Sequence, residues 1–160
     1  MLSQLAHLSA KADGRYATAY ELQFLKNYFK SFNLRLSAYE KIKASEAEII
    51  RKVQAKILSI NPNLFCNGSE DATLKWRLDT VRVLRQTAAA LLIDDAERLR
   101  NRFIVWFKTV LRALNVEESA DITYKLMLET VSEYLTPEEA ALFRPLWELN
   151  RLDIEKNNSN

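Results

Sequence analysis

Glycine and proline, the two residues least compatible with helix interiors, are rare in this chain: two glycines and three prolines occur among 160 residues. The strong helix formers Ala, Leu, Glu, Lys and Arg are abundant along its whole length. Hydrophobic residues make up 48% of the chain, enough for one domain to bury a core of its own. We therefore expect an all-α fold in a single domain.

Charge and cysteine content exclude several classes of protein. The 23 basic and 21 acidic residues are interspersed and leave a net charge of only +2, so the sequence predicts no nucleic-acid partner. The single cysteine, Cys66, cannot form an internal disulfide. The chain shows neither a signal-peptide pattern nor an apolar run long enough to cross a bilayer. We expect a soluble, cytosolic protein without a transmembrane segment.

The pattern of the first sixty residues predicts three helices. A short amphipathic helix over 3–11 ends at the Asp13-Gly14 turn. A second helix is expected from Thr18, which forms a capping box with Glu21, to about residue 32, with a wide aromatic face. A third covers about 34–60 and ends at Asn61-Pro62.

Four more helices are expected after a loop over 61–69 that holds Cys66. The first is capped by Ser69 or Asp71 and runs to residue 93, and the second covers 96–114 after the cap Asp94-Asp95. The third covers about 119–134, and the fourth begins at Thr136-Pro137, with Glu139 completing a capping box. The residues of the second expected to be buried are Phe103, Trp106, Phe107 and Val110. Those expected on the last helix are Leu142, Phe143, Leu146, Trp147 and Leu149.

Several segments resemble a known family. Two segments are similar to the N-terminal region of allophycocyanin and related phycobiliproteins: Ala-Asp-Gly-Arg-Tyr at 12–16 and Arg-Leu-Ser-Ala-Tyr-Glu-Lys-Ile at 35–42. Residues 48–53 and Asn61-Pro62 continue this pattern at the right spacing. Residues 76–79 resemble the chromophore segment Cys-x-x-Asp, and Arg85 falls where the family has arginine. The likeness covers about residues 12–115 and is much weaker over the last 45 residues.

The resemblance implies a globin-like phycobiliprotein fold with an N-terminal helical hairpin (1–33), a globin-like core (34–156) and a polar tail (157–160). In this family the hairpin docks against a second subunit, so we expect a homodimer or a complex with a related phycobiliprotein-like subunit. The resemblance also implies that Asp13 pairs across the interface with Arg85, whereas the simpler alternative is two solvated charges. The remaining interface candidates lie on the hairpin: Arg15, Tyr16, Tyr20, Phe24 and Tyr28.

The predicted pigment site departs from the family. Trp76 stands where the family has its chromophore cysteine, and an indole cannot form the thioether bond, so no covalent bilin is expected there. Asp79 matches the aspartate that holds the pyrrole nitrogens, and Arg77 is a candidate partner for a propionate. A non-covalent bilin therefore stays open, against the alternative that Asp79 only pairs with Arg82 or Lys75 on its own helix. Cys66, ten residues earlier, is interpreted as a free or half-buried thiol.

Other chemistries find no support in the sequence. The only histidine, His7, lies in the first short helix, where neither a haem ligand nor part of a metal site is expected. Adjacent acids at 94–95 and 117–118 are explained as helix caps, and no catalytic motif is present. Two functions remain: a pigment-free subunit that binds a partner in the phycobilisome or near bilin biosynthesis, or a non-covalent bilin carrier or sensor. In lacking the chromophore cysteine, the chain resembles the bilin biosynthesis-associated globins. A location at the periphery of the thylakoid membrane is compatible with this resemblance.

Overall fold

The computed structural model describes residues 1–61, 71–113 and 117–155, and in these ranges it contains helices and no strands. The predicted loop with Cys66, the candidate cap Ser69 and the tail 157–160 lie outside the described residues. The helical elements, in chain order, are α1 (Leu2–Lys11), α2 (Gln23–Ile60), α3 (Asp71–Ile93), α4 (Ala96–Leu99), the π-helical turn η1 (Arg100–Ile104), α5 (Val105–Ala113), α6 (Glu117–Ser132) and α7 (Pro137–Glu155).

The longest helix, α2, replaces the two helices predicted over 18–32 and 34–60. It runs for 38 residues without interruption, about 57 Å at the usual rise per residue. The prediction of a break near residue 33 was wrong, because Tyr28 and Arg35 fasten this part of α2 to the end of α3. The Tyr28 hydroxyl donates to the Leu92 carbonyl at 3.1 Å, and the Arg35 guanidinium donates to the Leu91 carbonyl at 2.9 Å.

The predicted capping box at Thr18 forms, although the helix begins later. The Thr18 amide donates to Glu21 Oε2 at 2.9 Å, and the Glu21 amide donates to Thr18 Oγ1 at 3.3 Å. Residues 19–22 form a turn, and the regular helix starts at Gln23. The box therefore shapes the entry into α2 rather than its first helical turn.

The corner between α3 and α4 is built by two aspartates. Asp94 has φ 49°, in the left-handed region that lets the chain leave α3, and Asp95 caps α4 by accepting from the Arg98 amide at 3.0 Å. The same carboxylate accepts from the Ser3 amide at 2.8 Å and from its hydroxyl at 2.7 Å. The cap predicted at 94–95 is thus confirmed, and it also holds α1 against the start of α4.

Trp106 is exposed, which corrects its predicted place in the core: 52% of it is accessible to solvent. Its neighbours Phe103, Ile104 and Phe107 are buried. Because Ile104 also faces inward, the core-facing side of the helix is centred near Phe107, and Trp106 is turned about 100° away from it. The π-helical turn η1, which ordinary helical spacing did not anticipate, lies just before this point.

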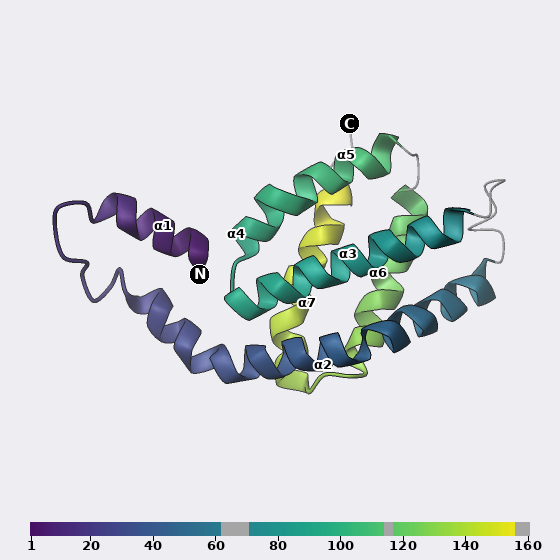
Figure 1. Ribbon diagram of the computed structural model, residues 1–160, viewed down its shortest axis with the longest axis horizontal. Coiled ribbons are helices and arrows are strands. Elements are labelled where there is room, and N and C mark those ends of the chain that lie inside the picture. Colours follow the sequence, from purple (N-terminus) through teal and green to yellow (C-terminus); the bar gives the residue numbers. More distant parts are fainter. Residues whose placement is uncertain (62–70, 114–116, 156–160) are drawn as a thin grey trace.

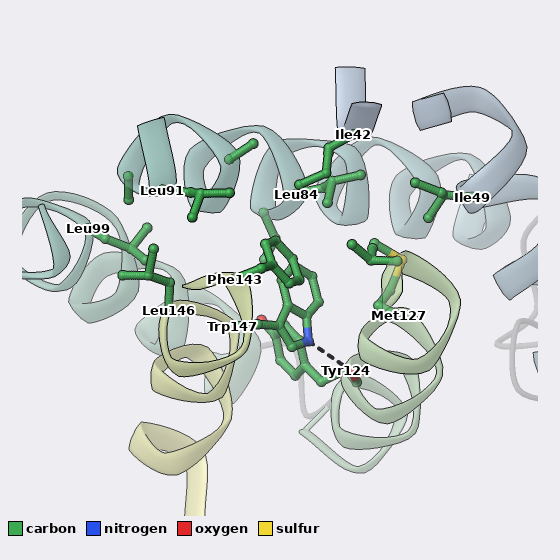
Figure 2. Close-up of a cluster of buried hydrophobic side chains, with 14 of the residues drawn as sticks. Ile42, Ile49, Leu84, Leu91, Leu99, Tyr124, Met127, Phe143, Leu146 and Trp147 are labelled. Atoms are coloured by element: carbon green, nitrogen blue, oxygen red, sulfur yellow. Dashed lines mark hydrogen bonds between the residues drawn. The ribbon is translucent and has the colours of Figure 1, made fainter. Parts of the chain in front are cut away.

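The core forms where α2 and α3 pack against α6 and α7 (Figure 1). Its centre is Trp147 of α7, which is 1% exposed, stacks on Phe143 at 5.5 Å and meets Tyr124 of α6 edge-on at 5.6 Å. Figure 2 shows the Trp147 Nε1–H bond to the Tyr124 carbonyl, 2.9 Å long, between the two helices. The capping box predicted at the start of α7 is confirmed: the Thr136 amide donates to Glu139 at 2.8 Å.

The N-terminal part of the chain lies to one side of this core and contacts it at the start of α4 and the end of α3. Figure 1 shows α1, the connection after it and the first turns of α2 extending to one side of the other helices. Gly14 lies in this connection with φ 73°, a conformation that glycine adopts without strain. We call residues 1–33 the N-terminal arm.

Candidate functional site

The first candidate site is the turn of α3 that carries Trp76, Arg77 and Asp79. Trp76 is half-buried, and its indole Nε1–H donates to Thr123 Oγ1 of α6 at 3.0 Å. Asp79 lies one turn later on the same side of the helix and is half-buried, whereas Arg77 is exposed. The structure therefore brings Trp76 and Asp79 together against α6 and leaves Arg77 outside.

Asp79 lies near enough to Tyr124 of α6 for its charge to affect the Tyr124 hydroxyl. Burial raises the pKa of the Tyr124 hydroxyl, and the negative charge of Asp79 raises it further. Within the described residues no ion pair joins Asp79 to Lys75 or Arg82. The Asp79 carboxylate is half-exposed to solvent, a place where an N–H donor from a ligand would be favourable.

The second candidate site lies between α2 and α3. A cavity of about 370 Å³ opens there, lined by Tyr39, Ile42, Lys43, Glu46, Leu84, Arg85 and Ala88. Arg85, predicted as an interface residue, forms a bidentate pair with Glu46 at 2.7 Å for both bonds. Lys43 is exposed and has no ion pair in the described part of the chain, so the rim carries two cations and one anion. Lys43 and Glu46 were missed from the sequence, because nothing local connects them to Arg85.

The third candidate site is the N-terminal arm. Tyr16 and Tyr20 are 97% and 89% exposed, and Asp13 is also exposed. Arg15 is bound within its own chain, where its guanidinium donates to both Glu21 oxygens at 3.0 and 2.8 Å. The hydrogen bond from Arg15 and that from the Thr18 amide hold the pKa of Glu21 well below its usual range.

The aromatic residues exposed on the arm are not the ones that were predicted. Tyr28 is 7% exposed and belongs to the core contact with α3, while Phe24 is half-buried. Phe29, which was not among the predicted interface residues, is 70% exposed. Adjacent residues on a helix point about 100° apart, so Tyr28 and Phe29 could not share one face, and that signal was present in the sequence.

Other chemistry has little basis in the described residues. His7 is exposed, and its Nε2 lies 3.6 Å from Glu97. Among residues 1–61, 71–113 and 117–155 no cluster of three His, Cys, Asp or Glu side chains is arranged to hold a metal ion. Nor does any helix in those ranges combine the length and apolar character that crossing a membrane requires.

Comparison with known proteins gives the family. Residues 7–150 match the phycobilisome protein family. The chain is 28% identical over 135 residues to an allophycocyanin beta chain from Synechocystis sp., covering 82% of this chain and 84% of that protein. It is 23% identical over 154 residues to an allophycocyanin alpha-B subunit from Picosynechococcus sp., covering 92% and 96%. The helices described above have the all-α, globin-like fold that we expected from the resemblance. The chain belongs to the phycobilisome protein family.

Proposed function

We propose that this protein is a non-enzymatic, phycobiliprotein-like globin that acts in the phycobilisome or near bilin biosynthesis by binding a second subunit through its N-terminal arm. The observation that carries the proposal is the exposure of Tyr16, Tyr20 and Phe29 on an arm that extends to one side of the other helices. Several large apolar side chains exposed on one short part of a chain are typical of an interaction site. Trp76, which the resemblance matches to the chromophore cysteine, supports a subunit without covalent bilin at that position.

The cavity between α2 and α3 is a suitable receptor for the arm of a second copy. Its rim has Lys43 and Arg85 against Glu46, so an incoming carboxylate meets a net positive charge. Asp13 supplies that carboxylate at an exposed turn, next to Gly14, and Tyr16 follows as the apolar anchor. In a two-fold dimer each arm would reach the other copy's cavity, which makes the contact self-complementary.

Asp13→Ala and Arg85→Ala should each raise the dimer dissociation constant about tenfold, because each removes one partner of a charge-assisted contact. Sedimentation equilibrium over a concentration series measures this. Arg51→Ala is the matched control, since Arg51 also makes a bidentate pair with a glutamate, Glu48, at 2.9 and 2.6 Å, but lies away from the cavity. Combining Asp13→Arg with Arg85→Asp should recover part of the lost affinity. A wild-type protein that stays monomeric at high micromolar concentration would contradict the proposal.

A second function is favoured by the environment of Asp79. A half-buried carboxylate that makes no ion pair with its helix neighbours suits the pyrrole N–H groups of a bilin held without a covalent bond. Trp76, whose indole N–H is hydrogen-bonded to Thr123, would form one wall of such a site and would not be the attachment point of the bilin. The protein would then act as a carrier or sensor of bilin, and partner binding by the arm could accompany it.

Titration with phycocyanobilin tests this second function, with haem as the comparison pigment. We expect a red-shifted, narrowed bilin band that disappears in acid urea, because no thioether holds the pigment. Asp79→Asn should weaken binding about tenfold, since the charge on the acceptor is lost. Glu129→Gln, an exposed acid on α6, is the control for net charge. Wild-type protein that leaves the bilin spectrum unchanged would rule out the carrier.

A further inference from the structure

The outer face of the helical run from α4 through α5 has an unusual composition. The residues exposed there include Arg98, Arg102, Val105 and Trp106, while the opposite side is buried in the core. The complete exposed set is Arg98, Asn101, Arg102, Val105, Trp106, Thr109, Arg112 and Ala113, together with Ala96, Glu97 and Arg100 at its beginning. We call the stretch from Arg98 to Ala113 the outer ridge, and its exposed side chains include no carboxylate.

Positive charge is concentrated in this run. Residues 96–113 contain five basic residues and one acid, a formal charge of +4, whereas the whole chain carries +2, so all other residues together carry −2. Arg98 and Arg102 stand one turn apart, and within the described part of the chain neither side chain has an ion-pair partner. Two adjacent guanidinium groups of this kind match phosphate groups in geometry and charge.

The apolar centre of the outer ridge is held in a fixed position. Val105 and Trp106 are 59% and 52% exposed. The Trp106 ring lies 6.4 Å from the ring of Phe103 and 6.2 Å from that of Phe107, both of which are buried, so the indole rests on the core and still faces solvent. An indole beside arginines is suited to the boundary between water and hydrocarbon, where Trp is enriched.

The outer ridge would remain exposed if a second subunit bound at the cavity between α2 and α3. Figure 1 shows α4 and α5 along one edge of the molecule and α2 along the opposite edge. The cavity between α2 and α3 therefore does not share this surface, whereas α1 of the arm contacts the start of α4, where the ridge begins. A partner bound at that cavity would leave the outer ridge facing outward.

We propose that the outer ridge binds the surface of a bilayer containing anionic lipid. Arg98 and Arg102 contact lipid phosphates, and Trp106 with Val105 enters the headgroup region. A surface that binds a protein partner usually carries both acidic and basic side chains at its rim. This ridge instead presents cations around an apolar centre, as membrane-binding helices do. The attachment is peripheral and independent of the subunit contact proposed above.

Fluorescence titration with vesicles tests the proposal directly. Of the three tryptophans, Trp147 is buried and Trp76 half-buried, so Trp106 is the side chain whose emission should respond to lipid. Vesicles of phosphatidylcholine with phosphatidylglycerol should shift the emission to the blue at about 0.1 M salt, and about 1 M salt should reverse the shift. Pure phosphatidylcholine vesicles should leave the spectrum unchanged, and Trp106→Phe should abolish the shift.

Arginine variants test whether vesicle binding depends on the outer ridge or only on the net charge of the protein. Arg98→Gln with Arg102→Gln should weaken vesicle binding, measured by co-sedimentation, at least about tenfold. Arg51→Gln with Lys52→Gln removes the same charge from α2, on the opposite edge, and should bind like the wild type. Circular dichroism confirms that each variant is folded. Equal loss in both double variants, or no binding of the wild type to anionic vesicles, would overturn the proposal.

Discussion

Trp147→Ala should lower the free energy of unfolding by about 3–5 kcal/mol, the usual cost of deleting a large buried aromatic side chain. The indole is 1% exposed, lies against Phe143 and Tyr124, and bonds to the Tyr124 carbonyl at 2.9 Å, so truncation opens a cavity between α6 and α7 and removes a hydrogen bond. Such a loss is a large fraction of the stability of an ordinary domain. Urea unfolding followed by circular dichroism measures it.

Two other tryptophan variants calibrate that result. Trp147→Phe keeps most of the ring packing and should cost less, about 1–3 kcal/mol, mainly through the lost hydrogen bond and the smaller ring. Trp106→Ala removes a side chain that is 52% exposed and should cost less than about 1 kcal/mol. If Trp147→Ala and Trp106→Ala had equal effects, the core would not be centred where Figure 2 places it.

Lys41→Met should destabilise the protein by about 3 kcal/mol at neutral pH, because it leaves a buried carboxylate without its cation. The Glu139 side chain is 2% exposed and accepts from Lys41 Nζ at 2.8 and 2.7 Å, from the Ser37 hydroxyl at 2.7 Å and from the Thr136 amide at 2.8 Å. Lys125→Met is the control: Lys125 pairs with Asp121 at 2.6 Å but is 52% exposed, and such pairs contribute less than about 1 kcal/mol.

The pH dependence of Lys41→Met provides a second measurement. In the wild type, burial opposes ionisation, but the hydrogen bonds from Lys41, Thr136 and Ser37 outweigh it and keep the pKa of Glu139 below its ordinary value. The stability contributed by Glu139 is therefore complete above about pH 4.3 and is lost as pH falls through the lower folded pKa. Without Lys41 the pKa of Glu139 should rise, so the difference between variant and wild type should shrink in acid. A difference that stayed constant from neutral to acidic pH would contradict this account.

Local signals in the sequence predicted much of the helical framework. The capping box of Thr136 and Glu139, the cap at Asp95 and the turn at Gly14 each involve residues within a few positions of one another, so their chemistry can be recognised without a structure. The break in α2 was predicted wrongly because the contacts that keep the helix continuous come from α3. The contact between Tyr28 and Leu92 joins residues 64 positions apart, which no periodicity reveals.

The candidate sites show the same limit. Trp76 and Asp79 were singled out through the family resemblance, but the Thr123 partner of Trp76 is 47 residues away on another helix. Arg85 was singled out through the family resemblance, yet its partner Glu46 is 39 residues away and was not foreseen. The outer ridge was missed for a different reason: the excess of basic residues over 96–113 is visible in the sequence, but which of these residues are exposed beside Trp106 is known only from the structure.

The continuity of α2 has a mechanical consequence. Because α2 runs unbroken from the arm into the core, the direction of the arm is set by the hydrogen bonds of Tyr28 and Arg35 to the end of α3 and by those of Ser3 to Asp95. A subunit that bound the arm as proposed would be held at one orientation relative to the rest of the molecule, and a displacement of the arm would be transmitted to the corner between α3 and α4.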